Sequence, residues 1–194
     1  MTKEIVVSYF NENLEWLKQI NDYKVTTYNK SSLDIDGTIS LPNVGREMNT
    51  YFHHIIENYN NLSDWTFFTQ GNPLDHVPNY IEILNGFPET LTKKVKSVDD
   101  CHFFSNKPVF VCDLYGNPYH WGLNLKSVWE VFFESTPLEN FEFTAGCIFC
   151  VTKEQIMMRD ITFYRKCLEV TENRVSSPWE FERLMPVIFN KDIK

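Results

Sequence analysis

The segment Asn43-Val44-Gly45-Arg46-Glu47 carries residue types that can bind a phosphate group. A glycine permits a tight turn, and the free N–H groups of a helix that begins there can donate hydrogen bonds to an anion. Arg46 can make a two-pronged, charge-assisted contact with a diphosphate, and Asn43 can contact a hydroxyl group or the edge of a base. The alternative is an ordinary helix start, in which Glu47 favours the positive helix end. The spacing alone leaves both interpretations open.

A second polar segment, Gln70-Gly71-Asn72-Pro73-Leu74-Asp75-His76, follows an apolar run that ends at Thr69. Enzymes built on open α/β sheets place catalytic and metal-binding groups directly after strands. Asp75 and His76 could share a divalent metal ion, or Asp75 could act as a general base. Alternatively, Asn72 and Pro73 form a turn and Asp75 caps the next helix. The position after a buried strand favours a functional role.

Near the C-terminus, Trp179-Glu180-Phe181-Glu182-Arg183 places two carboxylates two residues apart. On a helix these carboxylates face different directions, so at most one of them can point into a cleft. A glutamate in partly dry, aromatic surroundings can have a raised pKa that suits a general base. The alternative is a Glu–Arg pair at the surface.

Two weaker candidates involve metal-binding residue types. Asp34-Ile35-Asp36 has the Asp-x-Asp pattern of many metal-using transferases, but Gly37 and the surrounding polar loop favour a solvated turn. His53 and His54 are adjacent, so on a helix they point about 100° apart and cannot comfortably bind one metal ion together.

The elements that must position these residues alternate between strands and helices, which indicates an α/β fold with a mostly parallel central sheet and helices on both faces. Strands are expected at residues 3–10, 23–28, 65–69, 108–114 and 141–151, the last interrupted by Gly146. Helices are expected at residues 14–20, 46–59, 77–84, 128–133 and 179–189, and two more begin after Thr152 and after Asp160. The helix at 77–84 is followed by a polar stretch that runs to Asp100.

Length and composition favour one domain spanning residues 1–194, because 43% hydrophobic residues can build one sizeable core. The formal charge of −8 and the lack of a large basic cluster argue against duplex nucleic acid as a partner. Short apolar runs predict no membrane span, and an odd set of five cysteines, including the pair Cys147 and Cys150, suits reduced core thiols in a cytoplasmic protein. The 15% aromatic residues suit either a stacking cleft or an aromatic core.

Taken together, these segments resemble a family of glycosyltransferase-like proteins catalogued as a domain of unknown function. Its members show a strand with a polar turn and a Trp-Leu pair, an Asn-x-Gly-Arg-Glu helix start, a Tyr-x-x-x-Ile-Ile-x-Asn-Tyr-x-Asn-Leu helix, and a strand that ends in a polar, glycine-containing motif. The matching segments here are residues 11–17, 43–47, 51–62 and 65–76, followed by 143–151, Phe163-Tyr164 and 179–189.

That family is similar to the GT-A class of glycosyltransferases, whose Rossmann-like sheet binds a nucleotide-sugar at the strand ends, often through Mn²⁺ or Mg²⁺ on an Asp-x-Asp motif. The resemblance implies a donor site formed by Asn11, Glu12, Asn43, Gly45, Arg46, Glu47, Gln70, Gly71 and Asn72. The last three occupy the usual position of the metal motif but include no carboxylate, so Asp75 or His76 would have to bind the metal. The resemblance also implies a base at the start of a late helix, for which Glu180 is the candidate, with Asp75 as the other.

The leading hypothesis is therefore transfer of a sugar from a nucleotide-sugar to a hydroxyl group of a glycan or another acceptor. A second hypothesis is a module that binds a nucleotide or glycan without turnover, which predicts binding but no product. A third is a metal-dependent phosphohydrolase that uses His53, Asp75 and His76, which requires tight binding of a divalent ion without nucleotide.

Overall fold

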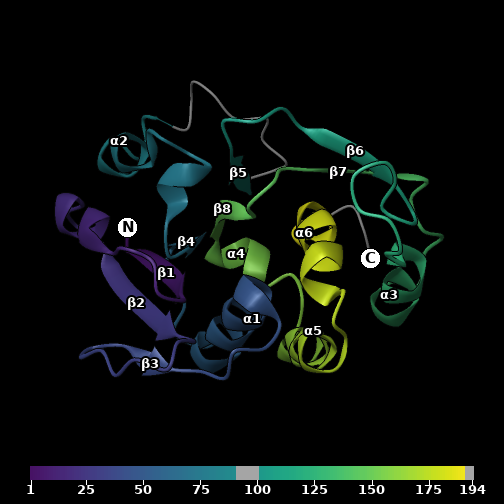
Figure 1. Ribbon diagram of the computed structural model, residues 1–194, viewed down its shortest axis with the longest axis horizontal. Coiled ribbons are helices and arrows are strands. Elements are labelled where there is room, and N and C mark those ends of the chain that lie inside the picture. The colour runs from purple at the N-terminus through teal and green to yellow at the C-terminus, as the bar shows by residue number, and fades with distance from the viewer. Residues whose placement is uncertain (91–100, 191–194) are drawn as a thin grey trace.

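The computed structural model describes residues 1–90 and 101–190, and its centre is a six-stranded sheet in the order β3-β2-β1-β4-β8-β5 (Figure 1). The four strands β3, β2, β1 and β4 run parallel, whereas β8 runs antiparallel to both β4 and β5. The expected α/β class with a largely parallel central sheet is confirmed. The strands are β1 (Lys3–Tyr9), β2 (Lys24–Asn29), β3 (Ile39–Ser40), β4 (Trp65–Gln70), β5 (His102–Phe104) and β8 (Ile148–Thr152).

The strand order reverses direction next to β1. The chain moves outward from β1 to β2 and β3, and then returns to the opposite side of β1 to form β4. Ser8 of β1 is in register with Tyr28 of β2 and with Gln70 of β4, so the carboxyl ends of the three strands lie level. Open α/β sheets bind their ligands at such a reversal, outside the carboxyl ends of the strands.

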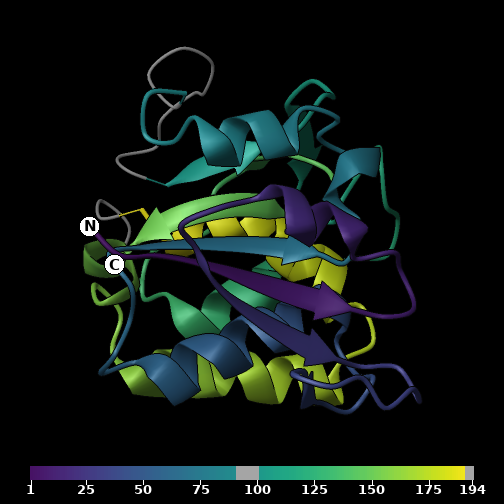
Figure 2. The same cartoon turned by 90° about the vertical axis from the view of Figure 1, so that its left-hand side faces the viewer.

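Helical segments cover both faces of the sheet (Figure 2). On one face pack α1 (Arg46–Asn58), α5 (Ile161–Asn173) and α6 (Ser177–Ile188). The other face is covered by shorter segments: the 3₁₀ turns η1 (Glu15–Gln19) and η2 (Pro73–Asp75) and the helix α2 (Tyr80–Asn85). The helix expected at residues 14–20 is only a 3₁₀ segment, because Asn13 accepts a hydrogen bond from the N–H of Glu15 and no side chain caps a longer helix.

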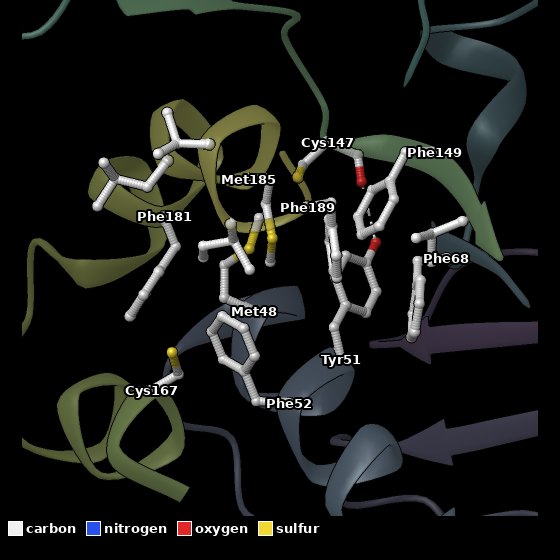
Figure 3. Packing of buried hydrophobic residues seen from close by; sticks show 14 of the residues in the cluster. Met48, Tyr51, Phe52, Phe68, Cys147, Phe149, Cys167, Phe181, Met185 and Phe189 are labelled. Atoms are coloured by element: carbon white, nitrogen blue, oxygen red, sulfur yellow. Dashed lines mark hydrogen bonds between the residues drawn. The ribbon is translucent and has the colours of Figure 1, made fainter. Parts of the chain in front are cut away.

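The larger hydrophobic core lies between the sheet and the face formed by α1, α5 and α6 (Figure 3). Tyr51 and Phe52 of α1 meet Phe68 of β4, Phe149 of β8 and Phe181 of α6 there, in tilted or edge-to-face ring contacts. All five cysteines are buried and free, which confirms that they pack as small apolar residues.

The strand expected at residues 141–151 is wrong as a single element. It divides into β7 (Asn140–Phe143), which pairs with β6 (Phe110–Asp113) in a separate two-stranded sheet, and β8 of the central sheet. Gly146 (φ 93°) and Cys147 (φ 45°) both have left-handed backbone conformations that end the extended chain between them. A Cβ atom at Gly146 would lie 2.8 Å from the ring of His76, so the expected obstruction is confirmed.

The remaining helices are α3 (Leu125–Phe132) and α4 (Lys153–Ile156). Thr152 and Gln155 form a capping box at α4, and Asp160 accepts hydrogen bonds from the first N–H groups of α5, as the sequence predicts. The polar stretch that was expected to end at Asp100 lies partly outside the described residues. None of the helices in the described parts of the chain has the length and apolar character needed to cross a membrane.

Candidate functional site

A cleft of about 290 Å³ opens at the carboxyl ends of β1, β2 and β4, where the strand order reverses. This first cleft brings together five residues of the predicted donor site, namely Glu12, Asn43, Arg46, Glu47 and Gln70. Three further residues also line it: Ser8, Phe10 and Lys30. Residues that follow different strands thus meet in one place, as the strand-end rule predicts.

Among the lining residues that sequence reasoning missed, Lys30 is the one that carries a charge. It is buried, and its ammonium group donates hydrogen bonds to the carbonyl oxygens of Val44 (2.5 Å) and Arg46 (2.6 Å). Burial lowers the pKa of Lys30 to about 8, an effect that the carboxylate of Glu47 opposes. Lys30 directly follows β2, so the rule that selected Asn11 and Glu12 after β1 would have found it.

The start of α1 has an uncommon backbone. Gly45 (φ 60°) and Arg46 (φ 48°) both adopt left-handed conformations, which an arginine rarely does. A Cβ atom at Gly45 would lie 2.7 Å from the Cβ atom of Thr171, so this glycine permits the close approach of α5 and does not line the first cleft. The Arg46 side chain is 59% exposed, and its Nε atom lies 3.6 Å from the carboxylate of Glu47.

Two largely buried carboxylates, Glu47 of α1 and Glu182 of α6, have raised pKa values. Burial raises the pKa of Glu47. Its own backbone N–H and the positive charges of Arg46 and Lys30 oppose this increase. Burial also raises the pKa of Glu182, which is opposed by the N–H of Gly146 at 2.9 Å and by Arg183. Glu47 raises the pKa of Glu182 further, because each negative charge disfavours the other.

Glu180, the predicted catalytic base, has a different environment. Its side chain is fully buried and accepts hydrogen bonds from the guanidinium of Arg174 at 2.5 and 2.6 Å, and from the N–H of Asn124 at 3.0 Å. It does not line the first cleft. Residues two apart on a helix differ in direction by about 200°, so Glu182 faces away from Arg174 and accepts hydrogen bonds from the N–H of Gly146 and the guanidinium of Arg183. Glu180 therefore pairs with Arg174 outside the first cleft, and Glu182, which does not line that cleft either, is a second candidate base.

The other predicted residues after β1 and β4 lie around the first cleft without lining it. Asn11 is exposed with φ 68°, and Asn72 is half-buried before η2. The carbonyl oxygen of Gly71 accepts a hydrogen bond from the Trp16 indole at 2.8 Å, and a Cβ atom at Gly71 would collide with the Glu12 carboxylate. Gly71 therefore allows Glu12 to fold over the end of β4.

Asp75 and His76, the predicted metal ligands, do not form a ready-made metal site. Asp75 is exposed at the end of η2, and the His76 ring packs against Gly146. Burial lowers the pKa of His76, as does Lys107, whereas Asp75 opposes the shift. Within residues 1–90 and 101–190, no three His, Cys, Asp or Glu residues form a group that could hold a metal ion. Asp34, Asp36 and His53 therefore belong to no such group.

Residues 5–82 match the model of a family described as a protein of unknown function (DUF3431). No curated protein and no solved structure matches the chain. The matched range includes every residue that lines the first cleft, whereas Trp179 and Glu182 of α6 lie beyond it. The similarity to this family therefore covers the part of the fold that builds the first cleft.

Proposed function

We propose that this protein transfers a sugar from a nucleotide-sugar donor to a hydroxyl acceptor, on a Rossmann-like domain of the GT-A type. The observation that carries the proposal is the first cleft, which lies at the reversal of strand order and contains two cations, Lys30 and Arg46. Open α/β sheets bind nucleotides at this position.

The donor diphosphate would bind between Lys30 and Arg46 at the start of α1. Two of the three donors on the Lys30 ammonium hold the backbone carbonyls of Val44 and Arg46, which fixes the charge in position. Arg46 is exposed enough to turn its guanidinium toward a phosphate and make a bidentate contact. Asn43 and Gln70 add amide groups that can contact the hydroxyls of a ribose or a sugar.

The transfer step requires a base, and we assign that role to Glu182, which shares one side of α6 with Trp179. Its raised pKa brings it closer to neutral pH, which favours proton transfer. Glu182 would accept the proton of the acceptor hydroxyl while the hydroxyl oxygen forms a bond to the anomeric carbon. The bond between that carbon and the diphosphate breaks, and its electron pair leaves with the diphosphate, whose charge Lys30 and Arg46 stabilise.

We propose that a divalent ion binds only together with the donor. Mg²⁺ is often held by one or two carboxylates together with substrate phosphates, and the first cleft contains two carboxylates, Glu12 and Glu47. These residues would hold such an ion, which would supply further neutralisation of the diphosphate. They replace Asp75 and His76 as the candidate ligands.

The proposal is tested by thermal shifts with a panel of nucleotide-sugars and nucleoside diphosphates, each with and without Mn²⁺, because a ligand that binds only the folded state raises the Tm. We expect one nucleotide to be selected, and Arg46→Ala to weaken its binding by about 10- to 100-fold through loss of a charge-assisted contact. Arg165→Ala, which removes an exposed arginine of α5, is the matched control. Unchanged affinity in Arg46→Ala, or no shift with any nucleotide, would contradict the proposal.

The second candidate function is a nucleotide- or glycan-binding module without turnover. It is favoured by the segment Gln70-Gly71-Asn72, which follows β4 and carries no carboxylate. This alternative predicts a thermal shift without formation of product, and equal ligand affinity in the wild type and in Glu182→Gln. No comparable observation supports the phosphohydrolase.

A further inference from the structure

We infer that the acceptor is a carbohydrate, and that it binds against Trp179 in a second cleft that adjoins the first. This inference rests on the proposed function and names the acceptor class for the same site. The second cleft has a volume of about 360 Å³ and lies between the start of α1 and the segment that joins α5 to α6. Both clefts are of a size that small ligands or single sugar units occupy.

Arg46 lines both clefts, so molecules bound in the two clefts would meet at this residue. Its guanidinium lies 5.5 Å from the centre of the Trp179 ring, on the side of the second cleft. A donor whose diphosphate contacts Arg46 in the first cleft would therefore present its sugar toward Trp179. This is the arrangement that a transfer between two bound molecules requires.

Trp179 occupies the first turn of α6 and stands between two polar groups. On one side is Arg46, and on the other is the His120 ring, whose centre lies 4.9 Å from that of Trp179. Trp179 and Glu182 are three residues apart on α6 and so lie on the same side of the helix. An acceptor resting on Trp179 would thus have its hydroxyl groups near the candidate base.

His120 belongs to the segment 115–122, which lies between β6 and α3 and carries further exposed aromatic rings. Its side chains Tyr115, Tyr119 and Trp121 are 54%, 53% and 80% exposed. Gly116 and Gly122 of this segment have positive φ angles. An exposed tryptophan contributes a large contact area that folding itself does not use, which is typical of a binding surface.

The chemistry of this surface favours a carbohydrate. A sugar ring has an apolar C–H face and a rim of hydroxyl groups, so it suits an aromatic ring that is flanked by hydrogen-bonding side chains. Trp179 and Pro178 supply apolar surface in the second cleft, and Glu172 and Asn173 supply polar groups. The guanidinium of Arg174 is held by Glu180, and the chain has a net charge of −8, so an anionic polymer is a poorer match.

The test is binding of neutral oligosaccharides of glucose, galactose, mannose and N-acetylglucosamine, measured by saturation-transfer NMR and calorimetry with and without a nucleoside diphosphate. We expect at least one oligosaccharide to bind. Trp179→Ala should weaken its binding at least fivefold, Trp179→Phe should restore most of it, and Trp121→Ala should weaken it while leaving nucleotide affinity within twofold. Val131→Ala, an exposed apolar residue on α3, is the control and should bind like the wild type.

The possible results separate this inference from the proposed function. If a nucleotide binds but none of the oligosaccharides does, or if oligosaccharide binding is unaffected in both tryptophan variants, the carbohydrate subsite is overturned and the transferase proposal stands. If oligosaccharides bind in the expected pattern but no nucleotide does, the subsite is supported and the transferase proposal fails. A protein or lipid ligand that competes for Trp121 in place of sugars would also overturn the inference.

Discussion

The two clefts that meet at Arg46 are built in different ways. The first cleft is charged and polar, and its residues follow β1, β2 and β4 or begin α1, all within residues 5–82. The second cleft is more apolar, and most of its residues come from the end of α5 and the start of α6, far along the chain. Under the proposed function, the strand ends supply fixed charges for an anionic group, whereas the late helices supply the surface for a neutral partner.

The same contrast recurs within α6 itself. Glu180 is fully buried and holds Arg174, which stabilises the connection between α5 and α6. Glu182 lies beside Gly146 and interacts with Glu47. Under the proposed function, the two glutamates have separate roles, one in stability and one in chemistry, and variants of each can test that proposal.

The largest expected effect is on turnover in Glu182→Gln. Removal of a general base typically lowers a rate by about 10²- to 10⁴-fold, so we expect a loss in this range with little change in nucleotide affinity. Initial rates of sugar transfer, together with calorimetry, measure the two quantities. The wild-type rate should rise with pH as Glu182 loses its proton at its raised pKa. A variant that retains more than a third of the wild-type rate would remove Glu182 from the mechanism.

The next largest effect concerns Arg174→Ala, which leaves the buried carboxylate of Glu180 without its partner. Unpairing a buried charge costs about 3–5 kcal/mol in the free energy of unfolding, which denaturant titration measures. Arg165→Ala on the exposed side of α5 should change stability by no more than about 0.5 kcal/mol. If both variants unfold at the same denaturant concentration, Glu180 does not have the stabilising role assigned to it.

The smallest effect is a pH dependence specific to the first cleft. Because burial lowers the pKa of Lys30 to about 8, its ammonium is mostly charged at pH 7 and mostly neutral at pH 9. Binding of a nucleoside diphosphate should therefore weaken by about tenfold between these pH values. Lys30→Arg, which keeps its charge, should show a flat profile, and oligosaccharide binding in the second cleft should be insensitive over the same range. A flat wild-type profile would show that Lys30 does not contact the anion.

Much of the N-terminal half could be predicted from local pattern. The nearly continuous apolar run of β1, which is buried on both faces, and the helical spacing of apolar residues in α1 each predict one element. The rule that ligands bind at the ends of parallel strands selected Glu12 and Gln70, and the glycine turn that opens a helix selected Asn43, Arg46 and Glu47. All five line the first cleft. Lys30 was accessible to the same rule, since it follows β2 directly.

Other features were decided only by tertiary packing. Helical periodicity shows that Glu180 and Glu182 point in different directions, but only the packing of α6 decides that Glu180 pairs with Arg174, whereas Glu182 contacts Gly146 and Arg183. From the sequence, Gly45 is interpreted as part of a phosphate-binding turn. In the structure a side chain at this position would collide with the backbone and side chain of Thr171, 126 positions later. The sequence alone therefore determined the strand ends and the charges placed there. The partners of those charges depend on contacts between segments distant in the chain, which no local pattern records.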